Sequence, residues 1–283
     1  MANEKFNRLI NWFKDWDNVL IAFSGGMDSS LITYIAKKVL GNNVLAVTVN
    51  SPLLSIGELN RARRIANIIG VRHLVLDLNL LENERIIENS PNRCYYCKLE
   101  FMGKLLEIAK FFGFNVVVDG TNIDDMKSYR PGIKALRELG IRSPLAEVGL
   151  SKADIRNISR KLNLPTMDMS STTCLATRIP YGVKLNLEVL RRVNMAELIV
   201  KQLTGISLVR VRDHGFIARI EVDRNERRKL FNEQVLDEIS RRLKKLGYLY
   251  VTMELEGYTS GSMDRLILSG NTKHKLETLI KFR

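Results

Sequence analysis

The sequence lacks long apolar runs and contains few cysteines. Its longest uninterrupted apolar stretches, such as residues 19–23 and 44–47, have the length of a strand and fall short of the roughly 18 residues that span a membrane. The first residues also lack the apolar segment of a signal peptide. We therefore expect a cytoplasmic protein that does not contact a membrane. Three cysteines, an odd number, do not suit a disulfide framework and point to metal or redox chemistry.

Acidic residues are outnumbered, and the basic excess lies in the second half. The 283 residues include 44 Lys and Arg against 31 Asp and Glu, a net charge of +13. Residues 1–150 contain 19 basic and 16 acidic side chains, whereas residues 151–283 contain 25 and 15. A basic half is typical of proteins that bind nucleic acid or phosphorylated small molecules, although a solvated Lys/Arg surface explains it equally well. The length indicates two domains.

Short apolar segments alternate with helical patterns in the first half. We expect strands at residues 19–23, 44–49, 73–78 and 116–119, with helices between them. Capping boxes that begin at Ser55 and at Ser151 predict two of the helix starts. Near-continuous apolar strands separated by helices predict an α/β fold, a doubly wound parallel sheet covered on both faces.

The pattern changes after Pro180. A helix is predicted over residues 187–203, a hairpin over 206–222, a long helix over 226–246 and a strand over 248–255. These elements form a smaller α+β domain. We expect domain limits of 1–180 and 181–283.

Residues 22–30 read Ala-Phe-Ser-Gly-Gly-Met-Asp-Ser-Ser and connect the first strand to a helix. The two glycines allow a sharp turn, and the exposed N–H groups at a helix start favour a phosphate. Asp28 can hold Mg²⁺ on that phosphate, and the serine hydroxyls can bond to its oxygens. The alternative is a glycine-rich turn with a helix cap and no ligand.

A second segment, residues 119–125, follows the fourth strand at the same edge of the sheet. Gly120 allows a close approach, and the acidic residues of this segment can share the metal or activate a group. Asn50 and Ser51, after the second strand, are candidate adenosine contacts. The candidate ATP-binding residues are Ala22, Ser24, Gly25, Gly26, Asp28, Ser29, Ser30, Asn50, Gly120 and Thr121.

Cys94 and Cys97 form a C-x-x-C motif at a predicted helix start, where the helix dipole lowers thiol pKa values. Together with Cys174 they provide three soft ligands, which suit an iron–sulfur cluster or zinc. None of the three histidines has ligand spacing to them. A redox pair, a metal site and unconnected cysteines all stay open on this evidence.

The Ser-Gly-Gly-x-Asp-Ser motif of residues 24–29 resembles that of the PP-loop ATP pyrophosphatases. Residues 174–182, Cys-Leu-Ala-Thr-Arg-Ile-Pro-Tyr-Gly, and residues 129–132, Tyr-Arg-Pro-Gly, resemble the LarE family within that superfamily. The resemblance extends along nearly the whole chain. It implies an adenine nucleotide α-hydrolase-like sheet and a homo-oligomer.

The LarE resemblance also implies a reaction. These ATP-dependent sulfur transferases adenylate a carboxylate of a pyridinium mononucleotide, release pyrophosphate and AMP, and leave a thiocarboxylate for nickel-pincer nucleotide biosynthesis. One branch gives up the sulfur of a single cysteine at the position of Cys174. The other binds a [4Fe–4S] cluster through three cysteines and uses sulfide or another sulfur donor. The implied cluster ligands are Cys94, Cys97 and Cys174, with Asp28, Cys174 and Lys98 as catalytic residues and ATP and Mg²⁺ as cofactors.

Arg210 and Arg212 alternate with valines in the predicted hairpin, so both guanidinium groups project from one strand face. Paired arginines can clamp a phosphate, and the resemblance assigns Arg178 and Glu197 to the same substrate site. Family members have arginines near residues 259–262, where this chain has Thr259 and Ser262. Because these arginines are absent here, the identity of the nucleotide substrate stays open.

Other functions fit parts of the pattern. A cluster-dependent tRNA thiolation enzyme would use the same chemistry, and the basic second half favours it, but no paired zinc-ribbon motif is present. An ATP-binding regulatory module would leave the cysteines unused. An amide-forming PP-loop ligase would not need three cysteines.

Overall fold

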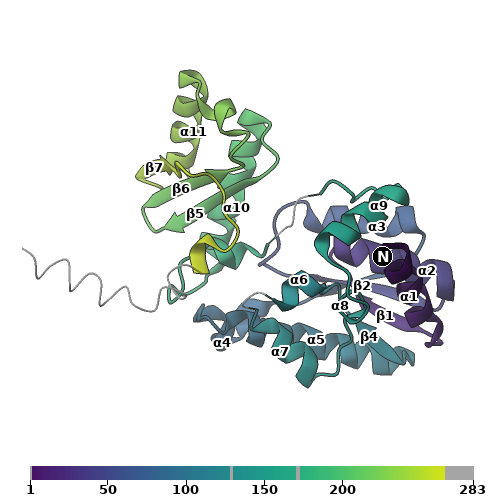
Figure 1. The fold of residues 1–283 in the computed structure, drawn as a ribbon. Coiled ribbons are helices and arrows are strands. Elements are labelled where there is room, and N and C mark those ends of the chain that lie inside the picture. The colour runs from purple at the N-terminus through teal and green to yellow at the C-terminus, as the bar shows by residue number, and fades with distance from the viewer. Residues whose placement is uncertain (1, 128–129, 170–172, 265–283) are drawn as a thin grey trace, which may run out of the picture. The chain divides into compact units, whose positions relative to one another are not determined.

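The computed structural model describes residues 2–127, 130–169 and 173–264, so Tyr129 of the family motif lies outside the described residues. The chain forms two compact units (Figure 1). The first contains residues 1–87 and 92–174, and the second contains residues 88–91 and the chain from 175 onward. The expected domain limits of 1–180 and 181–283 stay a prediction, because compactness does not test which segments fold independently.

The first unit is built on a parallel sheet. The sheet contains β1 (Val19–Ala22), β2 (Val44–Asn50), β3 (Arg72–Asp77) and β4 (Val116–Val118) in the order β3-β2-β1-β4. The chain winds from β1 outward to β3 and then crosses back to β4. The strand order therefore reverses between β1 and β4, and ligands of such folds bind at the carboxyl ends of these two strands. The α/β fold predicted from the sequence is confirmed.

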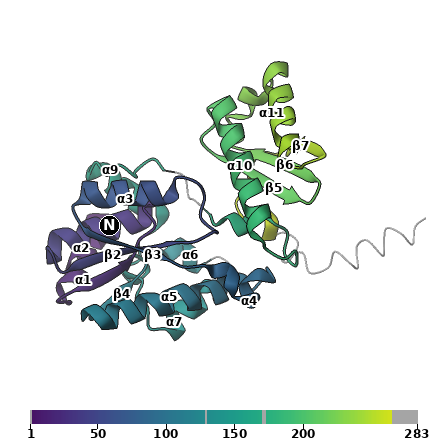
Figure 2. The same ribbon diagram turned by 180° about the vertical axis from the view of Figure 1, so that it is seen from behind.

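Helices cover both faces of this sheet (Figures 1 and 2). One face packs against α1 (Ala2–Lys14), α2 (Met27–Leu40), α3 (Glu58–Ile69) and α9 (Lys152–Lys161). The other packs against α5 (Arg93–Phe112) and α7 (Gly132–Glu138). The short helices of this unit are η1 (Leu80–Glu82), α4 (Glu84–Ile87), α6 (Ile123–Met126) and α8 (Pro144–Glu147). With both faces covered, apolar side chains fill most positions of β1, β2 and β4, whereas the edge strand β3 has polar residues at both ends.

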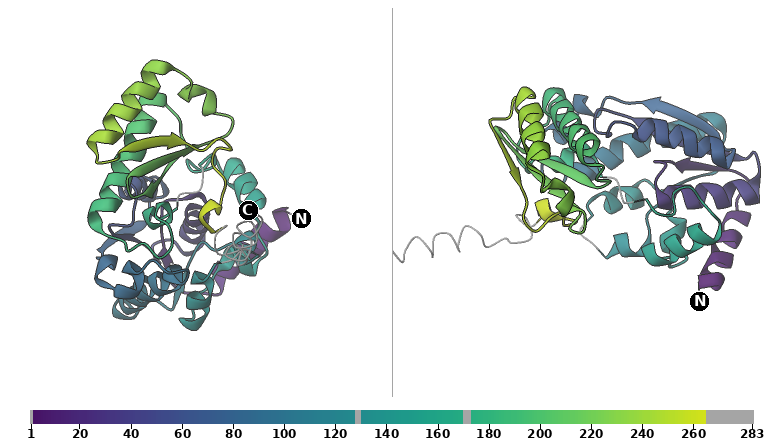
Figure 3. Two further views of the ribbon diagram at one scale, coloured as in Figure 1. Left: turned by 90° about the vertical axis from the view of Figure 1, so that its left-hand side faces the viewer. Right: turned by 90° about the horizontal axis from the view of Figure 1, so that it is seen from above.

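The second unit has a mixed sheet of three strands, β5 (Val209–His214), β6 (Ile217–Val222) and β7 (Tyr250–Met253). The predicted hairpin is present, since β5 and β6 are antiparallel, and β7 pairs with β6 in parallel. The helices α10 (Leu187–Thr204) and α11 (Glu233–Lys245) pack against each other beside the strands (Figure 3). The described part of this unit also contains the short 3₁₀ helices η2 (Leu175–Arg178), η3 (Arg227–Leu230) and η4 (Ser262–Asp264).

Two predicted helix starts were wrong. The helix expected from Ser55 begins at Glu58, because residues 55–58 form a turn in which the Glu58 N–H donates to the Ser55 carbonyl. The long helix expected over residues 226–246 is split, since the Asn232 side chain accepts from the Val235 N–H at 3.1 Å and starts α11 there. The capping box at Ser151 is confirmed.

Candidate active site

A tight loop connects β1 to α2. Gly25 has a φ of +66°, and a Cβ on it would lie 2.7 Å from the Cα of Ala62, so only glycine fits. The Ser24 hydroxyl accepts from the Gly26 N–H at 3.2 Å and lies 3.1 Å from the Ser29 hydroxyl. Gly26, the N-cap residue of α2, provides no capping side chain. The first N–H groups of α2 are thus available to an anion.

A pocket of about 530 Å³ opens at this loop, a size typical of small-molecule sites. Seven of the predicted ATP-binding residues line it: Ala22, Ser24, Gly26, Asp28, Ser29, Gly120 and Thr121. Gly25, Ser30 and Asn50 are not part of the lining. The Asn50 amide instead donates to Asp77 at 2.6 Å, and the roles proposed for these three residues stay predictions.

The segment after β4 lies directly against the loop. A Cβ on Gly120 would lie 3.1 Å from the backbone nitrogen of Ser29 and 3.3 Å from the Cβ of Asp28. A side chain at position 120 would therefore crowd the N–H groups that face the pocket. The two segments predicted from separate parts of the sequence form one site.

Asp28 lies in the lining with an incomplete set of partners. Its Oδ1 atom is buried and has no hydrogen-bond partner among the described residues. Burial raises the pKa of Asp28 to about 6, and the charge of Asp125 adds to this, against Lys152, Arg130 and a hydrogen bond from Asn122. A buried carboxylate oxygen without a donor is costly, and a cation beside Oδ1 would stabilise the charged form.

Asp125 stands between two cations in the same pocket. Its Oδ1 lies 3.0 Å from Arg130 and 3.4 Å from Lys152. In the part of the chain that the structure describes, no three His, Cys, Asp or Glu side chains are arranged to hold a metal ion. Mg²⁺ at nucleotide sites takes one or two carboxylates, with substrate phosphates and water as its other ligands. The Asp28 carboxylate fits that requirement, and its role as a Mg²⁺ ligand stays a prediction.

Lys98 was predicted as a catalytic residue, but three other cations of this pocket were not predicted as site residues. Arg130, Lys152 and Arg156 all line it. Lys152 and Arg156 are four residues apart on α9 and so share one helix face. Arg130 lies in the Tyr-Arg-Pro-Gly motif of residues 129–132, whereas no local signal marks Lys152 and Arg156, because cations at this spacing occur on many solvated helices.

The cysteines also reach this pocket. Cys97, on the second turn of α5, and Cys174 both line it, whereas Cys94 is exposed. Burial raises the pKa of the Cys97 thiol, and the thiols of Cys174 and Cys94 raise it further, against the charges of Lys98 and Arg93. The predicted lowering of thiol pKa values by the helix dipole was therefore wrong for Cys97. Burial outweighs the dipole there.

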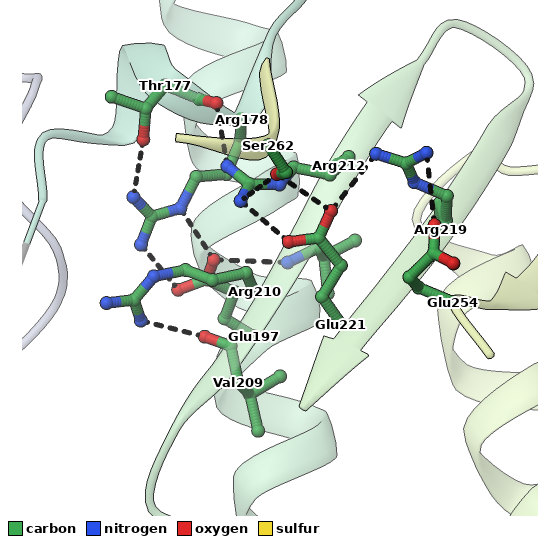
Figure 4. A network of polar contacts seen from close by, with 11 residues as sticks. Thr177, Arg178, Glu197, Val209, Arg210, Arg212, Arg219, Glu221, Glu254 and Ser262 are labelled. Atoms are coloured by element: carbon green, nitrogen blue, oxygen red, sulfur yellow. Dashed lines mark hydrogen bonds and ion pairs between the residues drawn. The ribbon is translucent and has the colours of Figure 1, made fainter. Parts of the chain in front are cut away.

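The arginines of the second unit form a buried network (Figure 4). Arg178 and Glu197 are both almost fully buried and form a bidentate pair, Nε to Oε1 at 2.7 Å and Nη2 to Oε2 at 3.2 Å. The Val211 N–H also donates to Glu197 Oε1 at 3.1 Å. Arg178 and Glu197, both predicted for the substrate site, are therefore in direct contact.

Arg210 and Arg212 are buried and do not form a solvated strand face. Arg212 donates to Glu221 at 2.6 Å and to the carbonyl of Thr177 at 2.8 Å (Figure 4). Arg210 donates to the Val209 carbonyl at 2.9 Å. Burial and the charge of Arg178 lower the pKa of Arg210, so an anion beside this group would be stabilising.

No helix within the described ranges is long and apolar enough to cross a membrane.

The family model described as queuosine biosynthesis protein QueC matches residues 18–90, which include β1, the loop and β2.

Three relatives match along most of the chain. The uncharacterized protein slr1717 of Synechocystis is 41% identical over 94% of this chain and 99% of its own. The pyridinium-3,5-bisthiocarboxylic acid mononucleotide synthase of Lactiplantibacillus plantarum is 37% identical over 95% of this chain and 96% of its own. The uncharacterized protein MJ0830 of Methanocaldococcus jannaschii is 33% identical over 90% and 95%. With its phosphate loop intact, the chain belongs to the LarE family of PP-loop ATP pyrophosphatases and is an ATP-dependent enzyme.

Proposed function

We propose that this protein is a sulfur transferase that adenylates a carboxylate of a pyridinium mononucleotide and converts it to a thiocarboxylate, a step of nickel-pincer nucleotide biosynthesis. The observation that carries the proposal is that Cys97 and Cys174 line the same pocket as the phosphate loop. A nucleotide-activating loop and a set of thiols in one pocket suit a reaction in which activation precedes sulfur transfer. The named activity of the L. plantarum relative supports the substrate class.

Adenylation is assigned to the loop and to Asp28. The N–H groups at the start of α2 would bind the phosphates of ATP, and Asp28 would hold a Mg²⁺ ion that neutralises part of their charge. A substrate carboxylate oxygen attacks the α phosphorus, and the bond to pyrophosphate breaks. The cations Arg130, Lys152 and Arg156 stabilise the charge on the departing pyrophosphate.

We propose Cys94, Cys97 and Cys174 as ligands of a [4Fe–4S] cluster. The donor type fits, because thiolates are the ligands of such clusters and the thiols of Cys94 and Cys174 act electrostatically on that of Cys97, although the described residues do not hold the three side chains in a metal-binding arrangement. Bringing three thiolates together without a cation is unfavourable, whereas metal binding removes their protons. A cluster with three protein ligands supplies one iron that is open to sulfide.

The substrate phosphate is assigned to the second unit. We propose that Arg210 and Arg212 bind it, with Arg178 and Glu197 holding the strand that carries them through the Val211 N–H. The lowered pKa of Arg210 supports this assignment, since a phosphate would stabilise its charged form.

The Arg210→Ala variant should weaken binding of the mononucleotide by about 1.5–3 kcal/mol, the value of a charge-assisted hydrogen bond. Calorimetric titration of wild type and variant with the mononucleotide measures this, and ATP binding serves as the internal control. Unchanged mononucleotide affinity would remove Arg210 from the substrate site.

The test of the function as a whole is product analysis under anaerobic conditions. The protein is purified without oxygen, assayed for iron and sulfide, and supplied with ATP, Mg²⁺, hydrosulfide and the pyridinium dicarboxylate mononucleotide. We expect AMP, pyrophosphate and a thiocarboxylate over many turnovers. Adding tRNA in place of the mononucleotide tests the tRNA thiolation alternative, and thiolated tRNA would favour it.

The Cys94→Ala variant separates the two LarE branches. It should lose both the iron content and multiple turnover, because three thiolates are needed to retain the cluster. Iron content and absorption spectra of wild type and variant provide a readout that does not depend on activity. Full activity with Cys174 alone would instead identify a single-use cysteine.

A further inference from the structure

Asp119 follows β4, and each of its two carboxylate oxygens accepts two hydrogen bonds. Its Oδ1 accepts from the Thr121 N–H at 3.1 Å and from the Ser143 hydroxyl at 2.7 Å. Its Oδ2 accepts from the Thr121 hydroxyl at 2.6 Å and from the Lys98 ammonium at 3.2 Å. A carboxylate offers about four lone-pair sites, so these bonds use all of them.

This saturation distinguishes Asp119 from Asp28. Asp28 has a buried oxygen without a hydrogen-bond partner among the described residues, which a metal can take, whereas Asp119 would have to give up a bond to bind one. Burial acts to raise the pKa of Asp119, but the charge of Lys98 and the bonds from Thr121 and Ser143 bring it below its ordinary value. Asp119 is therefore ionised, and its charge is directed at Lys98. The metal-sharing role considered for the acidic residues of this segment does not suit Asp119.

Lys98 lies where the ATP pocket meets the cysteines. It follows Cys97 on α5, lines the pocket, and acts electrostatically on the Cys97 thiol. The aliphatic part of the Lys98 side chain packs against Gly132. A Cβ at position 132 would lie 2.9 Å from Lys98 Cγ, so a larger residue there would displace Lys98. Its Nζ reaches Asp119 across this space, and about a quarter of the side chain is exposed. The ammonium group is thus held in place and still open to a ligand.

We propose that Asp119 is a positioning residue that holds the Lys98 ammonium against the adenylated substrate, where it stabilises the charge that develops on AMP. The proposal rests on the proposed function. In that step hydrosulfide attacks the acyl carbon, a C–S bond forms, and the bond from carbon to the phosphate oxygen breaks. The electron pair of that bond leaves with AMP, the thiocarboxylic acid loses the sulfur-bound proton to water, and no group is oxidised or reduced.

A double-mutant cycle tests the proposal. Asp119→Asn keeps the shape of the side chain but removes the charge that faces Lys98, and Lys98→Met removes the ammonium. Each should slow AMP formation with hydrosulfide about 100-fold, the size expected for one electrostatic contact to a developing charge. If Asp119 acts through Lys98, the double variant loses about 100-fold in total, since the two residues are one unit. Losses that multiply to about 10,000-fold would overturn the proposal.

Two further variants separate positioning from a structural role. Ser143→Ala removes a bond to Oδ1, the oxygen that does not contact Lys98, and should cost less than about fivefold. Lys98→Arg keeps a cation that can bond Asp119 and should recover at least tenfold of the activity lost in Lys98→Met. Equal activity of the Arg and Met variants would exclude an electrostatic role for residue 98, even if Asp119→Asn failed to fold.

A crystal structure of Asp119→Asn provides a readout without activity. The Lys98 ammonium should leave position 119, and an unmoved ammonium would refute positioning by Asp119. Failure of the proposed function is recognised separately, because wild type would then form no thiocarboxylate while the crystal structure still decides where Lys98 lies.

Discussion

Replacing Asp28 with asparagine is expected to slow pyrophosphate release about 100- to 1,000-fold, as loss of a key electrostatic group does in other active sites. The same change should stabilise the nucleotide-free protein. Asparagine resembles the protonated acid, and it removes a charge that lies buried beside Asp125. Opposite effects on activity and on stability are the sign of a residue placed for a ligand rather than for the fold.

The direction of the pH dependence follows from the raised pKa of Asp28. The folded-state pKa of about 6 lies above the ordinary value of 3.8, so the folded protein binds this proton more tightly than the unfolded chain does. The free energy of unfolding that Asp28 contributes is therefore highest below pH 4 and falls as the pH rises from about 4 to 6. A shift of this size corresponds to about 3 kcal/mol at neutral pH, which Asp28→Asn should recover. Affinity for ATP with Mg²⁺ should rise over the same interval, because the metal needs the carboxylate.

Urea denaturation at pH 4 and pH 7 measures the stability effect, and pyrophosphate release measures the activity. Asp17→Asn, which changes an exposed carboxylate of the same unit, is the matched control and should alter neither. Unchanged turnover in Asp28→Asn, or ADP and phosphate as products of wild type, would contradict the assignment of this loop.

The Arg178→Met variant is expected to destabilise the second unit by about 3–5 kcal/mol, the cost of removing one partner of a buried ion pair. Glu197 would remain buried without its bidentate partner, while the Val211 N–H would still donate to its Oε1. This loss would also weaken any role of the second unit in substrate binding. An activity defect in this variant should therefore be accompanied by a lower unfolding midpoint.

The double variant Arg178→Met/Glu197→Leu should recover most of the lost stability, because replacing both charges by apolar groups leaves no unpaired charge. Arg160→Met is the control, since Arg160 and Asp168 form an exposed pair at 3.0 Å that should contribute less than about 1 kcal/mol. Urea denaturation of the four proteins checks this. If Arg178→Met and Arg160→Met lost equal stability, the buried pair would not be a determinant of the second unit.

Much of the first unit could be predicted from the sequence, because its signals are local. Apolar runs of strand length, separated by helical patterns, indicate a parallel sheet covered on both faces, and the observed sheet agrees. The loop at residues 24–30 is equally local, since the glycines, the preceding strand and the following helix are consecutive in the chain. Element limits were less certain, because the turn at Ser55 and the cap at Asn232 compete with helix patterns that look continuous in sequence.

The sequence by itself therefore determined the sheet, the phosphate loop and the residue types available for chemistry, because these depend on neighbours along the chain. Only the tertiary structure decided the charge states and partners within the site. The dipole at the start of α5 indicated a low thiol pKa, but burial and the thiol of Cys174, 77 residues along the chain, raise the pKa of Cys97, and the neighbouring Cys94 adds to this. Alternation in β5 predicted that both guanidinium groups share one strand face, but only the fold shows that this face is buried and that Glu221 on the opposite strand pairs with Arg212. Burial and electrostatic interaction depend on atoms far apart in sequence, and folding alone brings those atoms together.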